Sequence, residues 1–326
     1  MAASSTYNLT GGINIYFSDN GAPPSSTDYT TLIILHGSAF NGEGFEKMHT
    51  FSHEYNLRTV IWNRREYPGS TKYTDAEIDD LHNGRKVFLD RLAIQVGDFI
   101  RQFVEKEDVP KISEDRKTGG FAILGWSMGT ATAMPLFSDG SLFSEKTYAL
   151  LEEYVKDLIL DDPPHLSFGI DPPRDAKIYD PWVDPDCKTP EELYQNFTVW
   201  VGSYYDHSNL QAARLATLDY NKRTDHTTIE SWTSGQFQRF YSQSAATRSE
   251  LPMYVQPMQS TLNDLAQRVL YDERLTQTIF PKVPVTYIGT TRTNWQCAWG
   301  YLKTKERYEE EAAKGHKVPL KIDNEA

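Results

Sequence analysis

Apolar and polar positions divide most of the chain into short apolar runs and longer amphipathic segments. The runs at 30–35, 58–62 and 155–160 have the composition and length of buried strands. Apolar side chains at helical spacing predict helices near 42–55 and over 84–107. Strands that alternate with helices predict an α/β fold, with a mostly parallel central sheet and helices on both faces.

The pattern changes between residues 163 and 280. Pro, aromatic and acidic residues dominate the first part of this stretch, and no buried β segment interrupts the remainder. Helical spacing within the stretch predicts helices over 190–201, 207–221 and 262–268.

Strand patterns return only after this stretch, at 283–289 and 318–323. The chain therefore leaves a sheet, passes through a long helical segment and returns to the sheet. We expect a core formed by residues 1–162 and 281–326, with residues 163–280 inserted as a helical cap.

A Gly-Trp-Ser-Met-Gly motif occupies residues 125–129, between an apolar run and a helix-forming segment. Its two glycines leave room for a sharp strand-to-helix turn that would strain the backbone at Ser127 and expose its hydroxyl. The free N–H groups of the following helix would point to the same place, where an oxyanion could form. This arrangement, a nucleophile elbow, makes Ser127 a candidate nucleophile.

Two further motifs precede the elbow. The run 30–35 ends in His-Gly-Ser-Ala-Phe at 36–40. The run 58–62 is followed by Arg-Glu-Tyr-Pro-Gly-Ser at 65–70. With these motifs in this order and spacing, the chain resembles the α/β-hydrolase family over nearly its whole length.

The resemblance implies esterase or lipase chemistry. A serine nucleophile at 127, where other branches of the family use a carboxylate, implies acyl transfer to water. The backbone N–H groups of Met128 and Ser38 would be the oxyanion donors, with Ala39 as the alternative donor from the loop.

The resemblance also implies a carboxylate acid, either after the strand that follows the cap or at the end of the strand before it. Residues 283–305 contain no Asp or Glu, whereas Asp161 and Asp162 end the apolar run before the cap. Pro163 favours an extended conformation at residue 162, which would project the Asp162 side chain past the strand end. We expect Asp162 to be the acid and keep Asp161 as the alternative.

The resemblance places the histidine base just after the final strand, and no histidine follows the strand predicted over 318–323. His316 precedes that strand, so roughly 20 Å of extended chain would separate it from the edge that carries Ser127. His316 is the candidate base within this chain, and His36 is expected to brace its own loop. We expect the natural product to continue beyond Ala326 with a histidine, and the 326-residue chain to hydrolyse weakly. The other histidines considered are expected to be exposed or satisfied by neighbouring groups: His165, His207 and His226.

Charge and composition exclude several classes of partner. A formal net charge of −12 and a pI near 5.2 argue against nucleic acids and anionic membrane surfaces, since both require a basic face. No run approaches 18 apolar residues, so no membrane span is expected.

Two cysteines and an N-terminus without basic or apolar signal regions favour a cytoplasmic location. The sequence has no metal-ligand cluster and no dinucleotide-binding fingerprint, so we expect neither a metal nor another cofactor.

These observations support a serine hydrolase that cleaves a small apolar carboxylic ester through an acyl-enzyme on Ser127. Aromatic residues of the cap would line part of its pocket. The alternative is a catalytically weak or inactive ligand-binding protein on the same scaffold, suggested by the missing histidine.

Overall fold

The computed structural model describes residues 2–172, 178–207, 217–316 and 320–325. Most of the helix predicted over 207–221, and the start of the strand predicted over 318–323, lie outside the described residues. Within the described part of the chain, no helix is both long and apolar enough to cross a membrane.

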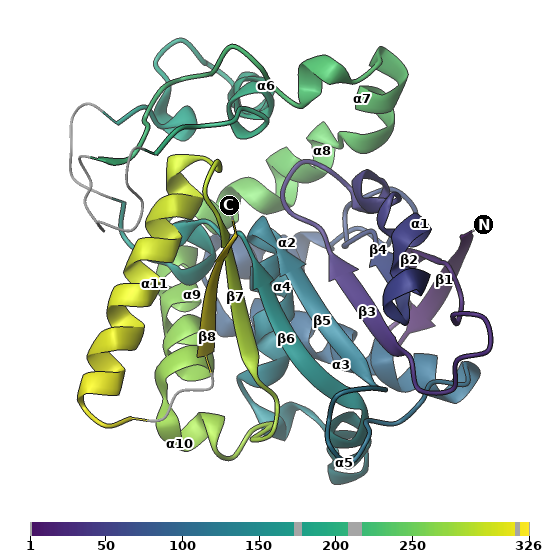
Figure 1. The fold of residues 1–326 in the computed structure, drawn as a ribbon. Coiled ribbons are helices and arrows are strands. Elements are labelled where there is room, and N and C mark those ends of the chain that lie inside the picture. The colour runs from purple at the N-terminus through teal and green to yellow at the C-terminus, as the bar shows by residue number, and fades with distance from the viewer. Residues whose placement is uncertain (1, 173–177, 208–216, 317–319, 326) are drawn as a thin grey trace.

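An eight-stranded sheet forms the centre of the described chain (Figure 1). Its strands are β1 (Ala3–Leu9), β2 (Ile13–Asp19), β3 (Thr30–Leu35), β4 (Leu57–Trp62), β5 (Phe121–Trp126), β6 (Val155–Asp161), β7 (Val285–Thr290) and β8 (Leu320–Glu325). They lie in the order β1-β2-β4-β3-β5-β6-β7-β8. β2 pairs antiparallel with β1 and β4, and all other neighbours are parallel. The predicted α/β fold with a mostly parallel sheet is confirmed.

Most helices that pack against the sheet cover the face that carries the main apolar cluster. They are α2 (Asp75–His82), α3 (Lys86–Lys106), α4 (Thr130–Ala133), α5 (Glu145–Tyr154), α9 (Met258–Ala266) and α11 (Trp295–Ala313). The α3 ring of Phe99 lies 4.6 Å from Trp62 of β4, and Phe103 lies 5.8 Å from Phe121 of β5. Each aromatic side chain packed in this way buries roughly 150–250 Å² of surface. The aromatic residues of α3 therefore contribute much of the main apolar core.

The opposite face of the sheet has a smaller cover. A separate apolar cluster of four buried strand residues, Leu32, Ile34, Ile61 and Ala122, packs against Phe45. Farther along the sheet, alternate positions of β6 and β7 are only partly buried. Helical turns therefore lie on both faces, but unevenly.

The helical pattern near 42–55 forms three short turns and not one continuous helix. Two 3-10 turns, Gly42–Phe45 and Ser52–Tyr55, flank the one-turn helix α1 (Met48–Phe51). A Cβ atom at Gly42 would lie 2.3 Å from the carbonyl oxygen of Trp62, so the first of these turns packs directly against β4.

The segment between β6 and β7 has two parts (Figure 1). The helices α6 (Pro190–Val201), α7 (Ser234–Phe240) and α8 (Gln243–Ala245) lie beyond the carboxyl ends of the strands. The helix α9 instead runs beside α11 and contacts the turn Met134–Phe137 of the core, and α10 (Glu273–Thr276) follows it. The stretch predicted as one cap thus includes helices that cover the sheet, and its boundaries at 163 and 280 remain a prediction.

Parallel strands bring their carboxyl ends to one edge of the sheet. β3, β5, β6 and β7 all end beneath α6 and α8 (Figure 1). The loops that follow these strands therefore meet, and they carry the candidate residues.

Candidate active site

Ser127 lies in a strained turn directly after β5. Its φ of +53° is in the left-handed region, which a non-glycine residue adopts at a cost of about 1–3 kcal/mol. A Cβ atom at Gly129 would lie 2.1 Å from the carbonyl oxygen of Leu35, and one at Gly125 would lie 2.7 Å from the backbone of Thr130. Only glycine fits at either position, so the motif folds as the sharp turn that its sequence predicts.

The loop 36–40 after β3 lies against this turn. A Cβ atom at Gly37 would lie 2.9 Å from the Cβ of Ser127, so the loop backbone approaches the candidate nucleophile closely. The N–H of Ala39 donates to the hydroxyl of Tyr67 at 2.9 Å. The Ala39 N–H is therefore already hydrogen bonded, and the N–H of Ser38 remains as the oxyanion donor from the loop, beside that of Met128.

His36 is fixed inside the same loop. The N–H of Arg64 donates to its Nε2 at 3.0 Å, so Nδ1 carries the proton and donates to the carbonyl of Gly37 at 2.8 Å. Complete burial, reinforced by the Arg64 charge, lowers the pKa of His36 well below its usual range. The ring is a neutral brace for the loop, and both nitrogens are occupied.

Asp162 follows β6 at the same edge. Its carboxylate accepts hydrogen bonds from the Thr293 hydroxyl at 2.6 Å and from the Thr290 N–H at 3.2 Å. Withdrawal from solvent raises the pKa of Asp162, while these hydrogen bonds act in the opposite direction. The carboxylate therefore faces the end of β7 and the loop after it, and its hydrogen-bond partners are two threonines and the Cys297 thiol of α11.

The extended conformation predicted at Asp162 is wrong. Its φ is +47°, in the left-handed region. Aspartate tolerates this region better than most residues, and here its backbone N–H also donates to Ile288 of β7 at 2.8 Å. Contacts with β7 and the loop after it outweigh the local preference that Pro163 imposes.

His316 lies at the other end of the sheet. It follows α11 and precedes β8, which runs parallel to β7, so it stands at the amino ends of the strands, whereas Ser127 stands at the carboxyl ends. Its Nδ1 is 2.7 Å from Glu311. The structure does not bring His316 together with Ser127 or Asp162.

Two other histidines lie nearer to the candidate edge, and both are already hydrogen bonded. His165 is buried, stacks on Trp295 at 5.5 Å, and contacts the carbonyl of Ile170 through Nδ1. His207 contacts the carbonyl of Thr293 through Nε2 at 2.8 Å and accepts from the N–H of Asp219 through Nδ1. Burial lowers the pKa of both rings, that of His165 to about 4.

A small cavity of about 20 Å³ lies beside Ser127, which is room for about one water molecule. It has apolar and aromatic walls from the insertion and polar groups from the two loops. The lining residues are Ser38, Ser127, Met128, Pro164, Leu166, Trp182, Phe197, Trp200, Val201, Tyr254, Asn294, Gln296 and Cys297. Neither a histidine nor a carboxylate is among these described residues. The arrangement thus holds a strained serine and backbone donors, without a base beside the serine.

No protein-family model matches the sequence, and no curated protein matches it in sequence. Solved structures do match in three dimensions. The esterase EaEST from Exiguobacterium antarcticum is 14% identical, with 99% of this chain and 90% of that chain covered and a TM-score of 0.52. A putative aryl esterase from Burkholderia cenocepacia is 12% identical at the same coverage and TM-score. Epoxide hydrolases of the α/β-hydrolase superfamily, from metagenomes of hot environments, match at 15% identity, with 99% and 91% covered and a TM-score of 0.50.

These matches cover 99% of this chain. The protein has the α/β-hydrolase fold. At such low identity the likeness establishes the fold alone, because this fold supports several chemistries.

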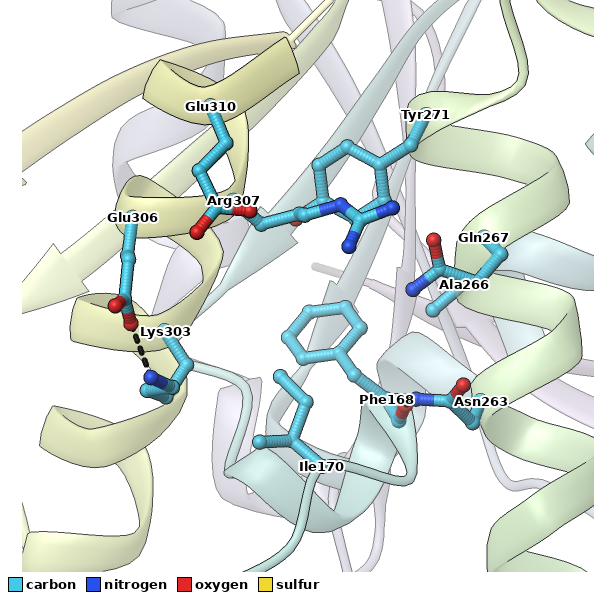
Figure 2. A pocket seen from close by; sticks show the side chains of 10 residues that line it. All are labelled: Phe168, Ile170, Asn263, Ala266, Gln267, Tyr271, Lys303, Glu306, Arg307 and Glu310. Atoms are coloured by element: carbon cyan, nitrogen blue, oxygen red, sulfur yellow. Dashed lines mark hydrogen bonds and ion pairs between the residues drawn. The ribbon is translucent and has the colours of Figure 1, made fainter.

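A second concave region of this α/β-hydrolase fold is separate from Ser127. It is a groove of about 270 Å³ between α9 and α11 (Figure 2). Figure 2 shows the guanidinium of Arg307 beside the ring of Tyr271, and Lys303 paired with Glu306. None of its lining residues lines the cavity beside Ser127, so the groove and the candidate site are distinct.

Sequence reasoning missed a buried ion pair next to the 36–40 loop. Arg64 and Glu250 lie 2.6 Å apart, with side chains only 8% and 2% exposed. Arg64 follows directly after a strand that ends at the candidate edge, and this position could have identified it as a site residue from the sequence. Glu250 has no such signal, because an acidic residue in a helical segment ordinarily faces solvent. Among the described residues, no group of His, Cys, Asp and Glu is arranged to hold a metal ion.

Proposed function

We propose that the protein is a serine hydrolase that cleaves carboxylic esters through an acyl-enzyme on Ser127. The observation that carries the proposal is the strained backbone of Ser127 between two glycines that no other residue could replace. Strain of this kind persists where the surrounding structure enforces it, and it is concentrated at functional sites. The esterases among the structural matches support the same reaction class by analogy only.

In this proposal Ser127 attacks the ester carbonyl. The backbone N–H groups of Met128 and Ser38 stabilise the oxyanion, and each such donor contributes roughly 10²- to 10³-fold in rate. Asp162 is the proposed acid of the site. A base is the missing element, because His316 lies at the opposite edge and no described histidine lines the cavity. Turnover should therefore be slow, since a serine hydroxyl is a weak nucleophile without a base.

The cavity walls suggest the type of substrate. Trp182, Phe197 and Trp200 offer apolar surface next to Ser127, and no charged side chain lines the described cavity. An ester with apolar groups on both sides of the carbonyl fits these walls better than a charged one.

Labelling with a fluorophosphonate probe, followed by peptide mass spectrometry, tests the proposal. We expect slow modification at Ser127, and slow turnover of activated apolar esters that Ser127→Ala loses. The proposal fails if Ser127 of the folded protein stays unlabelled and no ester from a broad panel reacts faster than with Ser127→Ala.

A ligand-binding protein on this scaffold is the second candidate. The cavity without a histidine or carboxylate favours it, because such walls bind apolar groups without chemistry. In that case small apolar esters and acids would raise the melting temperature while hydrolysis stayed at the solvent rate. Turnover that depends on Ser127 would eliminate this candidate.

A further inference from the structure

Glu250 comes from the insertion and reaches the 36–40 loop. It ends the helical turn Ala246–Glu250, and only 1% of the residue is exposed. One carboxylate oxygen accepts from the Ser38 hydroxyl at 2.8 Å. The other accepts from Arg64 at 2.6 Å and from the Tyr67 hydroxyl at 3.1 Å. A single buried carboxylate thus collects three donors, all of them from the core.

Two of these donors continue into the backbone of the loop. The Tyr67 hydroxyl, which donates to Glu250, accepts from the N–H of Ala39 at 2.9 Å. Arg64 also donates to the carbonyl of Gly37 at 2.9 Å. Together with Ser38, three consecutive loop residues are tied to the Glu250 carboxylate directly or through one side chain.

The loop needs such ties because its backbone is strained. Ala39 has a φ of +68°, in the left-handed region that a residue with a Cβ atom avoids. A strained loop keeps its shape only where neighbouring groups enforce it. The ties also fix the direction of the Ser38 N–H, the loop donor of the proposed oxyanion hole.

We propose that Glu250 is a positioning residue for the oxyanion loop, so that this loop is ordered only while the insertion is docked on the core. The inference rests on the proposed function for its effect on catalysis. Tyr254, also from the insertion and a wall of the cavity, adds a second link, because its hydroxyl donates to that of Ser38.

An ion pair that merely fastens the insertion is the competing explanation. The chain offers a matched control for it, since Arg239 of α7 pairs with Glu43 and Glu46 of the core. This second pair also joins insertion and core, but its side chains are 31–48% exposed and it does not touch the 36–40 loop. The two explanations therefore predict different effects for Glu250→Gln and Glu43→Gln.

The experiment compares Glu250→Gln, Ser38→Ala and Tyr67→Phe with Glu43→Gln in the full chain. Ser38→Ala and Tyr67→Phe leave the Arg64–Glu250 pair intact, so they keep the test valid if Glu250→Gln does not fold. Hydrogen–deuterium exchange of peptides that span residues 36–41 reports loop order without requiring activity. Ester turnover, with kcat and KM measured separately, reports the effect on catalysis.

We expect exchange at Ala39 to become at least about tenfold faster in the first three variants and to remain unchanged in Glu43→Gln. We expect kcat to fall roughly 10- to 100-fold with little change in KM, since the Ser38 N–H acts mainly in the transition state. Unchanged exchange in all three variants, or an equal response in Glu43→Gln, would overturn the inference.

Faster exchange without a fall in kcat would overturn the catalytic part of the inference while the proposed function stands. If the unmodified protein reacts no faster than Ser127→Ala, the proposed function fails. The exchange result still decides in that case whether Glu250 orders the loop.

Discussion

The Ser127 side and the Asp162 side of the same sheet edge differ in how completely they are built. On the Ser127 side, a strained serine, two glycines without room for a side chain and a braced loop fit together within a few ångströms. On the Asp162 side, the carboxylate is hydrogen bonded to Thr290, Thr293 and the Cys297 thiol instead of to a histidine. The difference teaches that a local motif, such as the turn around Ser127, can form in full while a catalytic residue from a distant part of the chain, here the histidine base, is missing.

Gly129→Ala should have the largest effect, because it disrupts the tight turn around Ser127. A Cβ atom there would lie 2.1 Å from the carbonyl oxygen of Leu35, and backbone cannot move aside as a side chain can. We expect the free energy of unfolding to fall by more than about 3 kcal/mol, at the upper end of overpacking effects. Denaturant unfolding measures this loss.

Gly235→Ala is the matched control, since a Cβ atom at Gly235 meets nothing within 4 Å in α7. This variant should be as stable as the original or slightly more stable, because alanine favours helix. If both variants unfold alike, the turn around Ser127 is not as tight as described.

His165 provides a pH test on the Asp162 side. The pKa of its buried ring is lowered to about 4, below the ordinary value of 6.5 that it regains on unfolding. The neutral ring contributes its full stability above pH 6.5, and that contribution is lost as the pH falls toward 4, because the unfolded chain binds the proton first. The loss amounts to up to about 3 kcal/mol.

Unfolding free energies at pH 7.5 and pH 4 check this expectation. His165→Phe keeps a ring against Trp295 and should lose less stability on acidification than the original chain. His226→Gln, at an exposed histidine, should follow the original chain. If His165→Phe lost as much stability on acidification as the original chain, His165 would not be the cause of that loss.

Asp162→Asn tests the incomplete side directly. Since the described side-chain hydrogen-bond partners of Asp162 are Thr290, Thr293 and Cys297, and none is a histidine, we expect turnover to fall by less than about tenfold, far below the 10⁴-fold typical of a working triad. Burial raises the pKa of Asp162, so the ionised carboxylate costs stability at neutral pH, and the neutral amide should not lower the free energy of unfolding.

Asp161→Asn serves as the neighbouring control, with a similarly small expected effect on ester turnover. A loss of three or more orders of magnitude in Asp162→Asn alone would contradict this prediction. It would show that a histidine contacts Asp162 in the working protein. The nucleophile side and the acid side of the site would then both be fully formed.

Cys297 gives the smallest effect and reports how closed the cavity is. Its thiol lines the cavity, and burial, with the nearby Asp162 charge, raises its pKa well above the usual range. We expect maleimide to modify Cys297 at least about tenfold more slowly than the partly exposed Cys187. Peptide mass spectrometry measures both rates, and unfolded protein should show similar rates at the two sites. Equal rates in the folded protein would mean that the cavity is open.

Local signals in the sequence were sufficient for much of the fold. The buried run 30–35 coincides with β3, and the helix predicted over 190–201 coincides with α6. The turn at Ser127 was predictable for the same reason, since the glycines that permit it lie two residues away on either side.

Features that depend on distant residues were not predictable. Pro163 favours an extended Asp162, yet contacts with Ile288, Thr290 and Thr293 hold it in the left-handed region. Glu250 is separated by 212 residues from Ser38, and no local pattern in the sequence links them. Tertiary hydrogen bonds of this kind override the preferences of individual residues.

The small cavity beside Ser127 has a consequence for ligand affinity. With about 20 Å³ available, the cavity holds about one water molecule, so an ester can enter only if the cavity walls move apart. Ligand must therefore enter a less populated open form, and the observed affinity is the intrinsic affinity multiplied by the fraction of molecules in that form. If about one molecule in a hundred is open, binding is about 100-fold weaker than the walls alone would allow. The population of the open form would then limit which ligands the protein can select.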